Sequence, residues 1–161
     1  MSTREFFLAR WEEEYPTFLK VFWALPADQP DFRPHPRSRS AAELVWLLVL
    51  EEQACVVWAG GRDVEWKETP APKSLDEIIS AYEKAHAELG PRLKALDDAA
   101  WERPVKLNVA GGPSYEAPLG EMFWYVMFDA IHHRGQLSLY IRLSGGKVPG
   151  IYGPSADDKM T

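Results

Sequence analysis

The stretch FDAIHHRGQLSLYIR, residues 128–142, concentrates polar side chains in a segment otherwise rich in Leu, Ile, Tyr and Phe. Helical residues three or four positions apart share a face. On a helix, this segment and the residues before it form one stripe, made of Met122, Val126, Asp129, His133, Leu137 and Tyr140. Most of that stripe is apolar or aromatic, so it is the side expected to face the core. Asp129 and His133 are therefore predicted to point inward, one turn apart.

The other polar residues of this stretch are expected on the flanks of the same helix. Successive helical residues point about 100° apart, so His132 cannot share the inward direction of His133. It falls in line with Gln136, and a half-exposed, hydrogen-bonded histidine is the simpler interpretation. Arg134 is expected to form a salt bridge, and Gly135 is expected to allow another backbone or subunit to approach closely.

The quoted stretch lies in the last of four helix-like segments, at about residues 3–24, 41–58, 75–98 and 119–144. The first three begin with a Ser-x-x-Glu capping box, which satisfies backbone amides at a helix start: Ser2 with Glu5, Ser40 with Glu43, and Ser74 with Glu77. Residues 105–117 alternate around a Gly-Gly-Pro turn, so a short hairpin or an ordered loop is expected there. Four long helices predict an all-α four-helix bundle.

Length and charge limit the classes of protein to which the chain can belong. Its 161 residues are expected to form one domain, with an extended tail from about residue 145 that is either packed on the bundle or partly disordered. The 24 acidic residues outnumber the 18 basic ones, which disfavours DNA or RNA as a partner. Cys55 is the only cysteine, and the longest apolar run, residues 44–50, is too short for a membrane span. We therefore expect a soluble, cytoplasmic protein that binds neither nucleic acid nor membranes.

Two interpretations of Asp129 and His133 follow from the residues alone. In one, the carboxylate accepts a hydrogen bond from the imidazole, and the pair rigidifies the bundle. In the other, both residues bind a divalent metal together with a donor from a facing helix, as in metal-binding bundles. Residues 41–58 carry an apolar stripe whose one charged member is Glu51. That carboxylate either reaches solvent or supplies the third donor.

The segments HHRGQLSLYIRLSGGKVPGIYGPSADD, residues 132–158, and RSRSAAELVWLL, residues 37–48, resemble the DinB family of DinB/YfiT-like metal-dependent enzymes. The resemblance implies a small four-helix bundle, often a homodimer, that binds zinc or nickel through one His on the second helix and an HxxxH pair on the last. Matched residue by residue, the second His of the pair is His133, and the first falls on Asp129, which still offers a ligand. The second-helix position falls on Leu47, which cannot bind metal. Glu51, one turn further along, is the candidate replacement.

The resemblance also implies a function. Members of the family are similar to thiol-dependent transferases and isomerases, and a hydrolase is a further expectation. In this hypothesis a metal at Glu51, Asp129 and His133 lowers the pKa of a bound low-molecular-weight thiol or water, and His132 is the candidate catalytic residue that moves the proton. The alternative is a non-catalytic bundle with a degenerate metal site and a small-ligand pocket. A homodimer is expected in either case.

Overall fold

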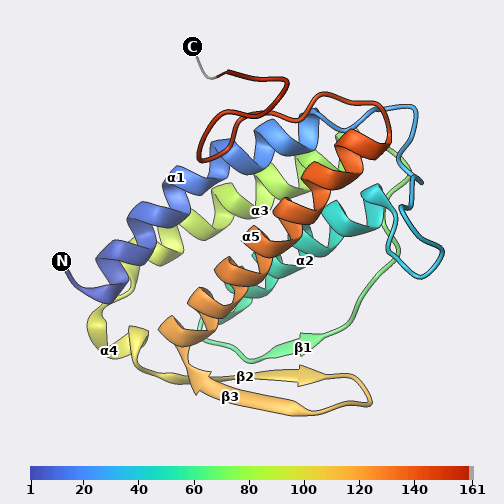
Figure 1. Ribbon diagram of the computed structural model, residues 1–161. Helices are drawn as coiled ribbons and strands as arrows, with labels where there is room; N and C mark the ends of the chain where they lie inside the picture. The colour runs from blue at the N-terminus through green and yellow to red at the C-terminus, as the bar shows by residue number, and fades with distance from the viewer. Residues whose placement is uncertain (160–161) are drawn as a thin grey trace.

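Four long helices pack side by side, and a small sheet crosses one end of the bundle (Figure 1). The computed structural model describes residues 1–159. Their elements, in chain order, are α1 (Thr3–Trp23), α2 (Ala41–Ala59), β1 (Val64–Trp66), α3 (Leu75–Ala95), α4 (Asp98–Trp101), β2 (Pro104–Val109), β3 (Ser114–Pro118) and α5 (Leu119–Leu143). The four long helices confirm the predicted bundle. The prediction of an all-α protein is wrong, because the described residues also form a three-stranded sheet.

The sheet has the strand order β1-β2-β3. β2 and β3 form the antiparallel hairpin, with Lys106 opposite Glu116. Gly111 lies in its turn with a φ of 71°, in the left-handed region that favours glycine. β1 pairs with β2 in parallel, and Val64 lies opposite Leu107. With three residues, β1 is too short to give a periodic signal in the sequence.

Capping boxes begin the first two helices as predicted. Ser2 with Glu5 and Ser40 with Glu43 each exchange the two reciprocal hydrogen bonds of the motif. Ser74 occupies the cap position of α3, but its side chain makes no capping hydrogen bond, so the third predicted capping box is wrong. α3 also ends before its predicted boundary, and α4 follows as a separate short helix.

The core consists of two apolar clusters. One fills the half of the bundle that holds the start of α2 and the end of α5, and the other fills the half next to the sheet. In the second cluster, the start of α5 lies against the ring of Trp101 in α4. A Cβ added at Gly120 would lie 2.1 Å from Cε2 of Trp101, so glycine is required for this close approach.

Arg134 differs from its predicted position on a helix flank. Its side chain is 1% exposed, forms an ion pair with Glu14 of α1, and lies over the ring of Phe18. The predicted salt bridge is therefore confirmed, but it is buried. Arg134 points about 100° away from His133 around α5, and this side of the helix faces α1.

The C-terminal segment, residues 145–159, packs on the bundle, which decides between the two expectations for the described part of this tail. Tyr152 accepts a hydrogen bond from Arg134, Lys20 forms an ion pair with Asp158 at 2.9 Å, and Arg142 forms one with Asp157 at 2.7 Å. These contacts hold the segment on α1 and α5, on the opposite side of the bundle from the sheet (Figure 1). Among residues 1–159, no helix is both long and apolar enough to cross a membrane.

Candidate metal centre

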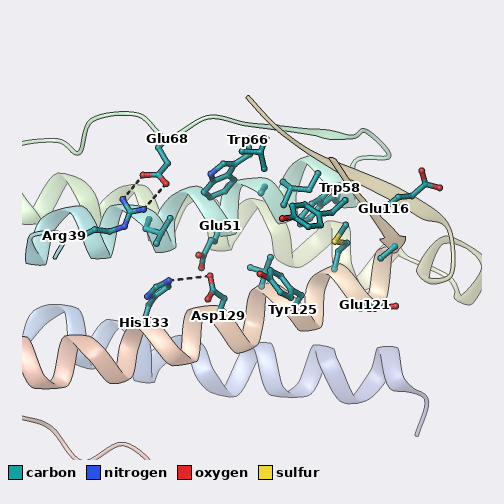
Figure 2. Close-up of a pocket in the computed structure, with 18 residues that line it drawn as sticks. Arg39, Glu51, Trp58, Trp66, Glu68, Glu116, Glu121, Tyr125, Asp129 and His133 are labelled. Carbon is teal, nitrogen blue, oxygen red and sulfur yellow. Dashed lines mark hydrogen bonds and ion pairs between the residues drawn. The ribbon is translucent and has the colours of Figure 1, made fainter. Parts of the chain in front are cut away.

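The structure brings Glu51 of α2 together with Asp129 and His133 of α5. One potential ligand atom from each of the three residues lies within 4.8 Å of the other two. Figure 2 shows Glu51 pointing from one helix toward the two side chains of the other. His133 Nε2 lies 3.5 Å from Asp129 Oδ2. All three predicted metal ligands are therefore neighbours across the α2–α5 interface.

Glu51 is the buried member of this cluster, with 6% of its surface exposed. Its Oε2 atom is buried and has no hydrogen-bond partner among the described residues. Burial raises the pKa of Glu51 to about 9, and the nearby Asp129 carboxylate adds to the shift. Without a cation, Glu51 therefore holds a proton at neutral pH, whereas a bound cation would stabilise its ionised form.

His133 is oriented by a hydrogen-bonded chain along α5. Its Nδ1 lies 3.0 Å from Gln136 Oε1, and because an amide oxygen only accepts, Nδ1–H is the donor. In the neutral imidazole, this arrangement places the lone pair of Nε2 on the side of Asp129. The amide nitrogen of Gln136 in turn donates to His132 Nε2 at 2.9 Å. A second hydrogen bond of this kind fixes the tautomer of a metal-binding histidine.

His132, the predicted catalytic residue, does not line the cavity beside the cluster. Its ring is on the exposed side of α5, as the helical angle relative to His133 predicts. The structure connects it to the cluster only through Gln136. Gly135 lies on the same exposed side, with open space around it. The homodimer expected through this side stays a prediction, which sedimentation of the full chain would test.

A cavity of about 640 Å³ lies beside the three residues, between α2, α5 and the sheet. Its walls are largely apolar and include Trp58, Trp66 and Tyr125, which Figure 2 shows around its middle. This volume is typical of pockets that bind small molecules. The β2–β3 hairpin, one of the two structures expected for residues 105–117, closes one side of the cavity.

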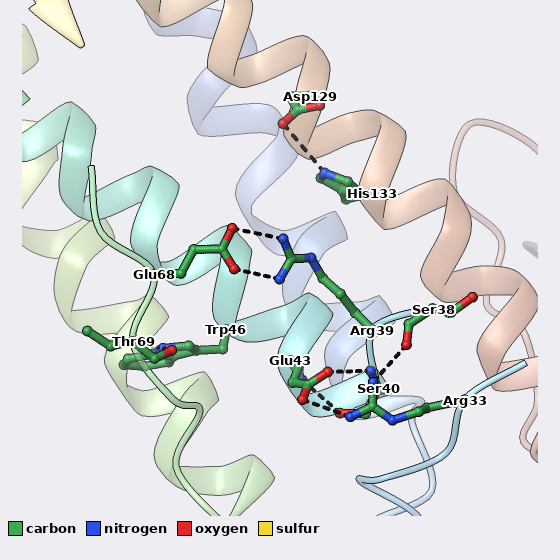
Figure 3. Close-up of polar contacts among 10 residues, drawn as sticks. All are labelled: Arg33, Ser38, Arg39, Ser40, Glu43, Trp46, Glu68, Thr69, Asp129 and His133. Carbon is green, nitrogen blue, oxygen red and sulfur yellow. Dashed lines mark hydrogen bonds and ion pairs between the residues drawn. The ribbon is translucent and has the colours of Figure 1, made fainter. Parts of the chain in front are cut away.

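Arg39 and Glu68 form a bidentate ion pair at one end of this cavity (Figure 3). The two guanidinium Nη atoms donate to the two carboxylate oxygens at 2.6 and 2.9 Å. The pair lowers the pKa of the Glu68 carboxyl, because the guanidinium donates to its ionised form. Arg39, Glu68 and Leu47 also line a second cavity of about 570 Å³ on their other side. The ion pair and Leu47 therefore lie between the two spaces.

The sequence did not predict this ion pair, nor a second cluster around Glu52, the residue after Glu51. Glu52, the next residue of α2, accepts hydrogen bonds from Trp11 Nε1 and His86 Nδ1, both at 3.0 Å. The His86 ring stacks between Trp11 and Tyr15. The two adjacent glutamates in the middle of a largely apolar helix were a usable signal for this cluster. No local sequence signal indicated the pairing of Arg39 with Glu68, which are 29 residues apart.

A model of the DinB family matches residues 1–160. The chain belongs to the DinB family. The uncharacterized protein YrdA of Bacillus subtilis (strain 168) is 25% identical over 163 residues, which cover 98% of this DinB chain and 92% of YrdA.

Solved structures share the DinB fold. A DinB-like protein from Bacillus cereus ATCC 10987 superposes with a TM-score of 0.77 at 22% identity, covering 92% of this chain and 97% of that protein. The mycothiol-dependent maleylpyruvate isomerase superposes with a TM-score of 0.55 at 12% identity, over 91% of this chain and 62% of the isomerase. At these identities the likeness concerns the fold.

The donor set of this DinB chain fits a divalent cation. Two donors on one tetrahedral zinc, each about 2.0 to 2.1 Å from the metal, lie roughly 3.4 Å apart. His133 Nε2 and Asp129 Oδ2 are already 3.5 Å apart, and the unpartnered Glu51 Oε2 supplies the buried negative charge that a cation would neutralise. Leu47 lines the same cavity one turn earlier on α2 and brings no donor atom.

Proposed function

We propose that this protein is a metal-dependent enzyme that uses the cavity between α2, α5 and the sheet to transform a small molecule. The observation that supports it is the convergence of Glu51, Asp129 and His133 on a cavity of about 640 Å³, with an unpartnered buried carboxyl oxygen among them. A divalent ion at this site would supply Lewis-acid chemistry, lowering the pKa of a bound water or thiol. The reaction class is thiol transfer or hydrolysis.

Each residue of the centre has a distinct part in this proposal. His133 presents Nε2, because its Nδ1–H donates a hydrogen bond to Gln136 Oε1. Asp129 is the more exposed carboxylate, with 41% of its side chain accessible, and it faces the incoming water or thiol. Glu51 supplies the ligand on the buried side of the proposed metal centre. We assign His132 to positioning His133 through Gln136, since its ring lies outside the cavity.

The donors also bear on the choice of metal. Two carboxylates and one imidazole are a harder set than the three imidazoles expected from the family pattern, and carboxylates suit manganese as well as zinc. Zinc, nickel, manganese and ferrous iron therefore belong in one titration.

The test is metal binding followed by activity. We expect about one equivalent of divalent metal per chain, measured by elemental mass spectrometry after loading and desalting, and its loss in Glu51→Gln and His133→Ala. Glu88→Gln, on an exposed part of α3 outside the cavity, is the matched control that keeps the metal. Metal-loaded protein is then incubated with esters, amides and alkylating electrophiles, with and without a thiol. Turnover that persists in His133→Ala would contradict the proposal.

Leu47 favours a second candidate, a non-catalytic bundle in which a protonated Glu51 is stabilised beside Asp129 and no metal is needed. In that case the cavity binds a small ligand without chemistry. A chain that takes up none of the four metals at saturating concentration, and whose unfolding midpoint does not rise with them, would support this candidate.

A further inference from the structure

The charged side chains around the cavity are strongly unbalanced. Five carboxyl groups line it, from Glu51, Glu68, Glu116, Glu121 and Asp129, whereas Arg39 is the one lysine or arginine among its lining residues. That arginine is already occupied by both carboxylate oxygens of Glu68. The cavity therefore offers negative charge to a ligand and little free positive charge.

A bound metal would leave part of this imbalance in place. It would neutralise Glu51 and Asp129, but Glu116 and Glu121 line the opposite end of the cavity from the Arg39 and Glu68 pair (Figure 2). Glu116 has one ion-pair partner, Lys106, at 3.4 Å, and both side chains are at least half exposed. Glu121 has no ion pair with any residue of 1–159. Glu121 and the exposed Glu116, which shares its charge only with Lys106, therefore keep this end of the cavity acidic whether or not a metal is bound.

Aromatic rings form the wall between the acidic end and the metal centre. Trp58 is fixed by a hydrogen bond from its Nε1 to the Lys106 carbonyl at 2.9 Å, and Trp66 and Tyr125 also line the cavity. Aromatic faces attract cations and also cover apolar groups. Rings together with carboxylates are the combination that binds organic ammonium groups.

We infer that the cavity takes a cationic small molecule, an amine or ammonium compound with an apolar portion, whose charged group lies at Glu116 and Glu121 and whose apolar portion lies along Trp58 and Trp66. A second observation points to a ligand in the same space: the buried, unpartnered Oε2 belongs to Glu51, which lines the same cavity. The inference rests on the proposed function only in placing the reacting end of the molecule at the metal centre.

An anionic molecule is the competing class. It would have to displace Glu68 from Arg39, breaking two short hydrogen bonds, and would bring its own charge close to Asp129. A cation meets neither obstacle. The structure thus favours a positively charged ligand over a negatively charged one, and probes that differ only in charge can test this preference.

The experiment is calorimetric titration of the metal-free full chain, in chelator at pH 7, with 4-phenylbutylamine, 4-phenylbutanol and 4-phenylbutyrate, which share an apolar part and differ in charge. We expect the amine to bind about tenfold more tightly than the alcohol, and the acid more weakly than either. In the double variant Glu116→Gln, Glu121→Gln, amine affinity should fall about tenfold to that of the alcohol, while alcohol affinity is unchanged. Glu88→Gln should bind all three as the parent does.

Three results would overturn the inference: the acid binding as tightly as the amine, amine binding that the double variant leaves unchanged, or no amine binding at millimolar concentration. Because metal is absent, these failures are separate from failure of the metal proposal. Metal uptake by the double variant provides the converse check. It should equal that of the parent, since neither substituted residue belongs to the metal centre.

Discussion

A carboxyl oxygen of Glu51 lies within 4.8 Å of a carboxyl oxygen of Asp129, although one residue comes from α2 and the other from α5. Two ionised carboxylates this close would repel each other strongly in a partly buried site, so one of them takes up a proton. Glu51 is the one more deeply buried, and its pKa rises to about 9. The metal-free protein therefore keeps this pair together by protonating Glu51.

This proton makes the stability of the metal-free protein depend on pH. The folded state holds the Glu51 proton up to about pH 9, whereas the unfolded carboxyl releases it near its ordinary pKa of 4.5. Stability is therefore fully present below about pH 4.5 and is lost as the pH rises toward 9, with a slope approaching about 1.4 kcal/mol per pH unit for one proton. Urea unfolding in chelator at pH 5, 7 and 8.5 measures it.

The comparison with Glu51→Gln isolates this contribution from those of other groups. The amide mimics the protonated acid, so the stability difference between parent and variant should shift in favour of the variant as the pH rises. Glu88→Gln should follow the parent at every pH, because that exposed side chain has no comparable burial. A parent and Glu51→Gln variant with parallel pH profiles would contradict the prediction.

Gln136 is expected to act on metal affinity without contacting the metal. Gln136→Leu removes the acceptor of the His133 Nδ1 proton, and losing such a partner typically costs about 10- to 100-fold in affinity. Gln136→Glu keeps an acceptor in place and should retain most of the affinity. His132→Ala, one bond further away, should cost less than Gln136→Leu. Competition with a fluorescent zinc chelator measures the three variants, and equal affinities for Gln136→Leu and Gln136→Glu would refute this role.

The meeting of Glu51, Asp129 and His133 could be predicted from the sequence largely because these residues lie on two regular helices. A fixed helical angle places Asp129 and His133 on one stripe, and a single charged residue on an apolar stripe identifies Glu51. The same angle placed Arg134 off this stripe, but it could not show that α1 covers that side with Glu14.

The parts that could not be predicted depend on contacts between loops and short elements. β1 has three residues and pairs with a strand about forty positions later, so no local periodicity reveals it. The Arg39 and Glu68 pair joins the start of α2 to the segment after β1. Since these elements build part of the cavity walls, the sequence predicted which three residues meet between α2 and α5 but not the shape of the cavity beside them.

Leu47 offers a test of the family pattern within this chain. Leu47→His restores a donor at the expected second-helix position, in the wall of the same cavity as Glu51. Because even an outer partner changes affinity about 10- to 100-fold, a fourth donor should raise zinc affinity by at least about tenfold. Leu47→Phe introduces a ring of similar size with no donor and should leave affinity unchanged. The same chelator competition applies, and equal affinities for the two variants would show that position 47 does not face the metal.

Gly120 is expected to be essential for the sheet end of the bundle. In Gly120→Ala the new methyl group would meet the Trp101 ring at 2.1 Å, so α4 and α5 must separate, which typically costs about 1 to 3 kcal/mol. Gly135→Ala is the matched control on the same helix. A Cβ there meets no atom within 4 Å, and replacing a helical glycine should add roughly 0.5 to 1 kcal/mol of stability. Urea unfolding of both variants should therefore shift in opposite directions from the parent, and a stabilised Gly120→Ala would mean that α4 does not pack on α5 in solution.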